Sequence, residues 1–157
     1  MEDFIKLIGG HVEVEVLRDG PNGPEVISRT ENHNLVVTQG KKRLVRMMQG
    51  NVTKMFRFFR LGSNSAAAGS ADTNVKTAIA SSIKTVDLKT VSSGRTYKWV
   101  ISYPSGVGSL SAAAIKECVL LDAKTSPGGS CLMRTVLTPV AKTTTDKLRL
   151  TYKFRIG

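Results

Sequence analysis

The feature that most constrains this chain is a strict alternation of side-chain character over its last strand-length segment, Lys147–Ile156. One face of this segment is apolar and consists of Leu148, Leu150, Tyr152, Phe154 and Ile156. The other face is polar or basic and consists of Lys147, Arg149, Thr151, Lys153 and Arg155. Successive side chains of a β-strand point to opposite faces, so the segment is predicted to be a strand with one buried face. Such a strand needs a second layer against its apolar side, which favours a layered β fold.

Shorter segments with the same period recur along the chain between turn-forming residues. Residues 11–17 alternate valine with histidine or glutamate, and the turn-rich stretch 19–24 leads into 25–28, which together predict a hairpin. The remaining strands are predicted at 34–37, 56–61, 83–91, 97–103, 115–122 and 131–138. Residues 75–82 fit either a short helix or a loop. The whole chain, 1–157, is therefore predicted to be a single mainly β domain, built as a β-sandwich or a Greek-key barrel.

One stretch departs from the strand period and predicts a helix. Its apolar residues lie at near-helical spacing among basic ones and are Leu44, Val45, Met47 and Met48. Thr38 is a suitable N-cap, and Gly50 closes the stretch. We therefore expect one short amphipathic helix near residues 40–49.

Composition and cysteine content exclude several classes of protein. Hydrophobic residues make up 41% and charged residues 22% of the chain, as in soluble globular domains. No apolar run approaches the length of a membrane helix, and the acidic first residues predict no secretory signal, so we expect synthesis in the cytoplasm and no membrane partner. Cys118 and Cys131 are expected to be buried thiols. They fall on two strands of one predicted hairpin where they could oppose each other, which leaves a cross-strand disulfide as the alternative.

No pattern of catalytic or ligand-binding residues stands out in the sequence. The two histidines, His11 and His33, belong to no Ser/His/Asp or Cys/His grouping, and no Cys-x-x-Cys pair accompanies them. The small-residue loop 62–69 lacks the Lys-Ser/Thr of a phosphate-binding loop. We therefore expect no enzyme, no metal site, no cofactor and no small-molecule substrate.

Charge is distributed unevenly along the chain, whose formal net charge is +11. Residues 1–34 are mainly acidic, whereas 41–60 contain no acid. The bases of that second stretch are candidate nucleic-acid contacts: Lys41, Lys42, Arg43, Arg46, Lys54, Arg57 and Arg60. The interleaved Phe56, Phe58 and Phe59 could stack on bases. The interpretation favoured here is that these phenylalanines belong to the core and that the bases form a solvated face.

Two charged stripes on predicted strands are candidates for a contact between subunits. Glu13 and Glu15 share the outward face of one strand. The basic stripe on the last strand consists of Lys147, Arg149, Lys153 and Arg155. Opposite charges on two copies of the chain would steer their association. The alternative is that the basic stripe only protects a sheet edge against uncontrolled strand pairing.

Three segments, taken in order, resemble a family of small structural proteins of tailed-phage virions, associated with tail, collar or fibre. They are 34–40, which reads NLVVTQG, 59–63 with 71–73, and the pair 115–123 and 131–139, followed by Lys142 and 146–148. One departure is Val119, where the family usually carries glycine. The resemblance implies a location in the virion, neighbouring virion proteins as partners, and no catalytic residues.

These observations lead to one expected function and one alternative. We expect a non-enzymatic structural subunit of the neck, collar, tail or capsid surface, made in the bacterial host and assembling with copies of itself into a symmetric homo-oligomer. The alternative is a nucleic-acid-binding protein that uses the basic segment 41–60.

Overall fold

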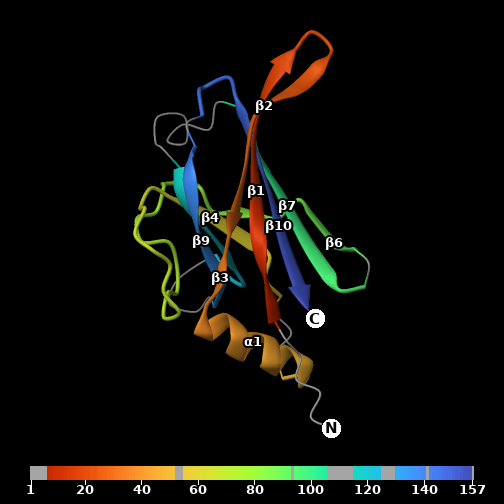
Figure 1. Ribbon diagram of the computed structural model, residues 1–157, viewed down its shortest axis with the longest axis vertical. Coiled ribbons are helices and arrows are strands. Elements are labelled where there is room, and N and C mark those ends of the chain that lie inside the picture. Colours follow the sequence, from red (N-terminus) through yellow and green to blue (C-terminus); the bar gives the residue numbers. More distant parts are fainter. Residues whose placement is uncertain are drawn as a thin grey trace.

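The strands of the chain form two five-stranded antiparallel sheets that pack face to face, as the computed structural model in Figure 1 shows. It describes residues 7–51, 55–92, 94–105, 115–124, 130–140 and 142–156. Sheet A has the order β2-β1-β10-β7-β6, with β1 Leu7–Gly20, β2 Gly23–His33, β6 Leu88–Ser92, β7 Thr96–Tyr103 and β10 Lys147–Ile156. Sheet B has the order β3-β9-β8-β4-β5, with β3 Leu35–Val36, β4 Phe58–Gly62, β5 Lys84–Thr85, β8 Ile115–Leu121 and β9 Cys131–Val140. This arrangement confirms the predicted mainly β fold and its sandwich form.

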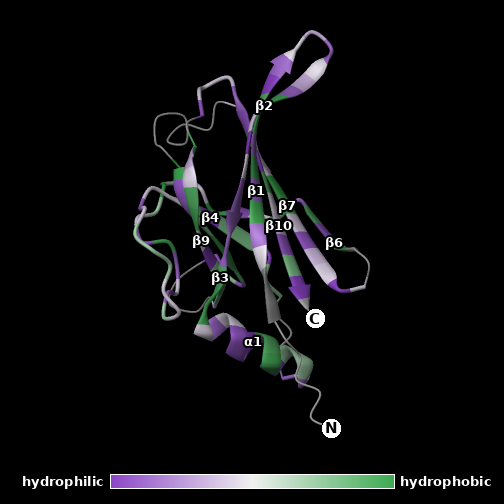
Figure 2. Cartoon of the chain, viewed as in Figure 1, coloured by the Kyte–Doolittle hydropathy of each residue, from purple (hydrophilic) through white to green (hydrophobic). Residues whose placement is uncertain are grey.

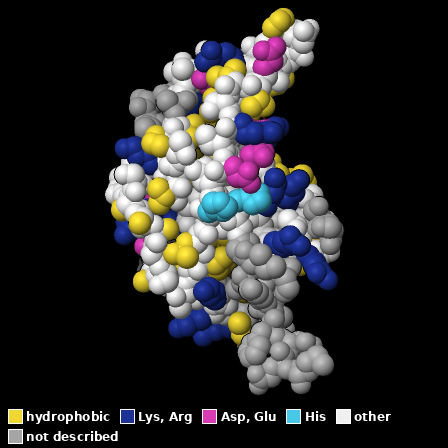
Figure 3. Space-filling view, viewed as in Figure 1, with side chains coloured by type: hydrophobic (Ala, Val, Ile, Leu, Met, Phe, Trp, Pro, Cys, Tyr) yellow, Lys and Arg dark blue, Asp and Glu magenta, His cyan; other side chains and the backbone are white. Residues whose placement is uncertain are grey.

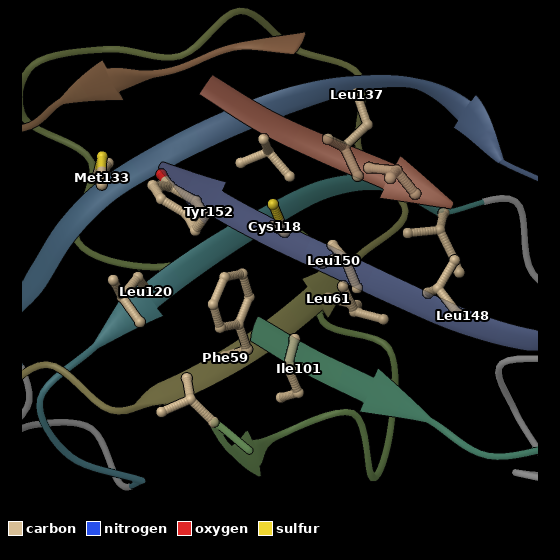
Figure 4. Close-up of a cluster of buried hydrophobic side chains, with 14 of the residues drawn as sticks. Phe59, Leu61, Ile101, Cys118, Leu120, Met133, Leu137, Leu148, Leu150 and Tyr152 are labelled. Carbon is tan, nitrogen blue, oxygen red and sulfur yellow. The ribbon is translucent and has the colours of Figure 1, made fainter. Parts of the chain in front are cut away.

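The alternation of β10 places its apolar face in the core, as predicted. Leu148, Leu150 and Tyr152 are fully buried, and Phe59 of β4 meets Tyr152 edge to face with ring centroids 5.4 Å apart. Figure 4 shows these side chains pointing into the space between the sheets, and Figure 2 shows the alternation of apolar and polar residues along the strands. Phe56, Phe58 and Phe59 are all buried, which confirms that they are core residues.

The position of β10 within its sheet corrects one sequence interpretation. β10 lies between β1 and β7 and pairs with both. Its basic stripe therefore does not protect a sheet edge, and that alternative is wrong. The edge strands of sheet A are β2 and β6. Edge position depends on how strands far apart in sequence pair, which the alternation of a single segment does not reveal.

Sheet B is covered on both faces, because the long loop 63–83 lies over its outer side. A second apolar cluster lies on this side and contains Val37, Phe58, Val119, Leu121 and Cys131. Val75 and Ile83 from the loop pack against it. This double burial accounts for the nearly continuous apolar sequence of β8. Among its described residues, segment 75–82 is loop with an isolated bridge from Ala78 to Gly62, so of the two alternatives for 75–82 the loop is correct.

Helix α1, Thr38–Met48, lies across one end of the sandwich. The predicted helix is confirmed, but its N-cap is Val37 rather than Thr38, and no side chain caps it. Gly50 ends the helix with φ +73°, and its N–H and that of Asn51 bond back to carbonyls of the last turn. Gly40 is buried, and a Cβ there would lie 2.3 Å from the carbonyl oxygen of Leu132 in β9. The absence of a side chain at this position thus brings α1 against sheet B.

The predicted strand 83–91 proves to be two strands in different sheets. β5 pairs with β4 in sheet B, and β6 pairs with β7 in sheet A. The chain crosses between the sheets at Val86 and Asp87, and the Asp87 carboxylate accepts the Ser102 N–H at 2.5 Å. The turn-forming residues after 91 indicate the β6–β7 hairpin. The crossing at Val86 and Asp87 carries no glycine or proline, so the sequence gives no signal that the chain changes sheets there.

The two cysteines are buried free thiols and do not oppose each other. Cys118 is paired in register with Thr135, and Cys131 with Leu121. Cys118 belongs to the core between the sheets, whereas Cys131 belongs to the outer cluster of sheet B. The possibility that they face each other across the hairpin is therefore wrong. Burial raises the pKa of Cys131 to about 12 and that of Cys118 further, which keeps both thiols protonated at neutral pH.

Candidate assembly surfaces

The β1–β2 hairpin extends beyond the rest of sheet A as an arm. β10 pairs with β1 as far as the pair Leu17–Lys147, whereas β1 and β2 continue for three further pairs to Gly20–Gly23. At roughly 3.3 Å per residue, this free end is about 10 Å long. The register with β2 shifts beyond Val16, which leaves Ile27 as an extra residue at the base of the arm. Such a bulge adds local twist, and Figure 1 shows the arm turned away from the sandwich.

The base of the arm is fixed to the body by two ion pairs. Arg18 contacts Asp146 at 2.8 Å, and Lys147 contacts Asp19 at 2.7 Å. Asp146 also accepts hydrogen bonds from the backbone and hydroxyl of Thr143. The bonds from Arg18 and Thr143 outweigh the effect of burial and hold the pKa of Asp146 well below its usual range. The arm is therefore held at its root while its tip projects.

The β2 strand of the arm, at the edge of sheet A, carries two exposed apolar residues and one acid. Val26 and Ile27 are 46% and 47% exposed. Glu25 is exposed and has no ion-pair partner among the described residues. Val26 lines an open hollow together with Leu17 and Leu148 of its own chain, so its side chain is covered only in part. We call residues 18–27 the arm and these three residues, which lie along its free β2 edge, its contact edge.

The outer side of α1 carries unpaired bases and exposed apolar side chains. Lys41, Lys42 and Arg46 are exposed, and none has an ion-pair partner within the part of the chain that the structure describes. With Val45 they line an open hollow on the helix surface. Val45 and Met48 are 54% and 67% exposed, while Leu44 and Met47 pack against the core. We call Lys41, Lys42, Val45, Arg46 and Met48 the α1 face.

The remaining candidate nucleic-acid contacts are dispersed. Arg43 is ion-paired with buried Asp122 at 2.9 Å. Arg57 lies over the Phe58 ring, 5.1 Å from its centroid, and Arg60 is half-buried on β4 in sheet B. Lys54 lies outside the described residues. The basic segment 41–60 thus places three bases on the α1 face and does not form a single surface.

The two charged stripes of sheet A pair within one chain. Glu15 is buried between Arg149 at 2.6 Å and Arg29 at 2.5 Å. Burial raises the pKa of Glu15, but the bonds from the two guanidinium groups outweigh it and leave the pKa below its usual value. Glu13 lies 3.8 Å from Lys153. The charge complementarity seen in the sequence is therefore used between neighbouring strands, and a role of this face between subunits stays a prediction. Arg155, the fourth base of the stripe, is exposed.

The two histidines lie side by side at one end of sheet A. His11 on β1 is paired in register with His33 on β2, and its Nε2 lies 3.0 Å from Glu31. Figure 3 shows both rings on the surface, next to acidic and basic side chains. Among the described residues, no group of three or more His, Cys, Asp and Glu side chains is placed to hold a metal ion.

A buried ion cluster holds the long loop 63–83 on sheet B, and sequence reasoning missed it. Arg134 of β9 is fully buried and contacts Glu117 of β8 at 2.7 Å and Asp72 of the loop at 3.0 Å. Glu117 accepts N–H groups of Thr77 and Lys76, and Arg134 donates to the carbonyls of Ala66 and Ala67. Glu117 and Arg134, charges of opposite sign among mainly apolar residues on the two strands of a predicted hairpin, were the signal that could have found it.

The cluster joins three segments that lie far apart in the sequence. Asp72, Glu117 and Arg134 come from separate segments of the resemblance and meet in one place. A Cβ on Gly62 would lie 2.4 Å from the Glu117 carboxylate, so this glycine makes room for the cluster. Val119, which stands where the family usually has glycine, is fully buried in the outer cluster.

No protein-family model matches the chain, and comparison with curated proteins and with solved structures finds no match either. In the described residues, no helix is both long and apolar enough to cross a membrane. The family resemblance of the three segments therefore stays a prediction. The surfaces described above are the basis for a functional proposal.

Proposed function

We propose that this chain is a non-enzymatic structural subunit of a tailed-phage virion, in the neck, collar, tail or capsid surface, and that it assembles into a symmetric homo-oligomer. The observation that carries the proposal is the β1–β2 arm, which projects beyond the last pair that β1 makes with β10 and has Val26 and Ile27, nearly half exposed, at its base. An arm of this kind is suited to reach a neighbouring copy. Other virion proteins are the further partners expected.

Apolar exposure at separate places supports the same proposal. Besides the arm and the α1 face, Leu88 and Val91 of edge strand β6 are 53% and 57% exposed, and Tyr97 beside them is also exposed. A subunit of a closed ring needs two different complementary patches, because each copy contacts one neighbour on either side. This chain offers more than one such patch.

Immunogold labelling of purified phage particles from a host infected with the phage that encodes this chain tests the location. The expected result is labelling at one fixed position of the particle. Unlabelled particles, with the chain recovered only in the soluble lysate, would contradict the proposal. Urea-washed particles that still carry the chain would exclude loose adsorption.

Nucleic-acid binding is the second candidate, and the three unpaired bases of the α1 face favour it. Binding through phosphates weakens steeply as salt rises. Filter binding of single- and double-stranded DNA at two salt concentrations tests this function. Salt-sensitive retention that is lost in Lys41→Ala/Lys42→Ala/Arg46→Ala would support it, and retention equal to the parent would oppose it.

A further inference from the structure

We propose that copies of this chain associate head to tail, with the arm of one copy docking on the α1 face of the next. This inference rests on the proposed assembly and names the two surfaces that make it. The partner of both surfaces is a second copy of the same chain.

The positions of the two surfaces favour this contact. Figure 1 is drawn with the longest axis vertical, and the arm lies at one end of this axis while α1 lies at the other. In a two-fold dimer each arm would lie on the partner's helix and no surface would stay free, whereas surfaces at opposite ends of the long axis favour a contact that leaves each copy one free arm or α1 face for the next copy. Such a contact is heterologous, and it gives a ring if the rotation between copies closes and a filament if it does not.

The charges of the two surfaces are complementary and unused elsewhere. The other described acids of sheet A near the arm have partners, since Asp19 contacts Lys147, and Glu15 contacts Arg149 and Arg29. Glu25 has none among the described residues, and neither do Lys41, Lys42 and Arg46 on the α1 face. Figure 3 shows an acidic side chain on the arm and basic side chains over α1. An acid meeting several unpaired bases steers association and sets its direction.

The apolar groups of the two surfaces complement this charge pattern. Val26 and Ile27 on the arm would cover Val45 and Met48 on the α1 face, each of them about half exposed or more in the single chain. Methionine is flexible and fits surfaces of irregular shape. The 11 residues of α1 span about 16 Å, which is enough to receive a two-stranded tip.

A mixing experiment with two variants tests the head-to-tail contact. The arm variant is Glu25→Lys/Val26→Ser, and the helix variant is Lys42→Glu/Arg46→Glu. Each retains one intact surface, and all four positions are exposed, so each is expected to fold like the parent by circular dichroism. The matched control for the helix variant is Arg95→Glu/Lys124→Glu, which makes the same charge change at exposed positions outside the arm, the α1 face and β6.

Light scattering gives the readout at concentrations where the parent assembles. Each variant alone is expected to have the mass of one chain, while the control assembles like the parent. An equimolar mixture of the two variants is expected to have the mass of two chains, because the helix variant's arm docks on the arm variant's intact α1 face and growth then stops.

If the parent assembles, three results would overturn the inference. One is a mixture that stays at the mass of one chain, and another is a variant that assembles as the parent does. The third is a helix variant that assembles normally but loses retention on DNA, which would assign the α1 face to nucleic acid. In all three cases the parent still assembles, so the proposed homo-oligomer stands and only its interface is wrong. A parent that stays monomeric overturns the contact, and particle labelling then decides the virion location separately.

Discussion

Arg134 is the residue on which the covering of sheet B depends most. Its guanidinium group is fully buried and joins Glu117, Asp72 and two loop carbonyls. Removing one partner of a buried ion pair leaves an uncompensated charge in a medium that solvates it poorly. The bonds from Arg134 to Asp72 and to the carbonyls of Ala66 and Ala67 hold loop 63–83 on sheet B, although the loop is rich in small residues.

We expect Arg134→Met to lower the free energy of unfolding by about 3–5 kcal/mol, because Glu117 then stays buried without its cation. Urea unfolding measures the loss. The matched control is Glu117→Gln/Arg134→Met, in which an amide oxygen still accepts the loop N–H groups without a buried charge, so a smaller loss is expected. A loss below about 1 kcal/mol in the single variant would show that the cluster contributes little.

Asp146 predicts how stability depends on pH. Its pKa is lower in the folded chain than in the unfolded one, so it stabilises the fold fully above about pH 4, the ordinary range of an aspartate, and less as the pH falls below it. Asp146→Asn should therefore be less stable than the parent at neutral pH and approach it in acid. Thermal melting at several pH values checks this. Asp19→Asn, at the exposed aspartate of the other ion pair at the base of the arm, is the control. Equal acid sensitivity of Asp146→Asn and the parent would contradict the account.

At the scale of the element, α1 depends on a glycine rather than on helix propensity. Alanine is the better helix former by about 1 kcal/mol, yet a Cβ at Gly40 would meet the backbone of Leu132. We expect Gly40→Ala to destabilise the fold by roughly 1–3 kcal/mol through overpacking. Gln39→Ala, at an exposed neighbouring position, should be neutral or slightly stabilising. Chemical denaturation measures the free energy of unfolding of both variants. A gain in stability for Gly40→Ala would contradict the packing of α1 against Leu132.

The elements show which features the sequence could predict. Alternation identified β1, β7 and β10, because each of these strands has an apolar face that lies in the core. β2, β8 and β9 were located by the turn-forming residues beside them, since β2 is mostly exposed and β8 and β9 are buried on both faces. Alternation could not identify sheet order, so β10 was read as a possible edge strand. It also could not identify the crossing at Val86, since a strand that changes sheets keeps its apolar period. The bases of 41–60 looked like one patch, but Arg43 is used inside the chain by Asp122.

At the scale of the whole molecule, the charged stripes of sheet A pair with each other within one chain and stabilise its fold. Arg149→Glu would place a second acid beside buried Glu15, and we expect a loss of roughly 1–3 kcal/mol because a charge-assisted hydrogen bond is removed. Lys147→Glu breaks only a pair with exposed Asp19 and should cost roughly 0–1 kcal/mol. Thermal melting compares the two. Equal losses would mean that Glu15 is not held by Arg149 as described.

Self-association is the central claim, and the arm and the α1 face are its physical basis. Light scattering of the purified parent chain, measured from micromolar to millimolar concentration at low and at high salt, tests it most directly. The predicted result is a mass that rises above that of one chain with increasing concentration and rises less at high salt, because the contact is partly electrostatic. A mass equal to one chain over the whole range, at both salt concentrations, would contradict the account.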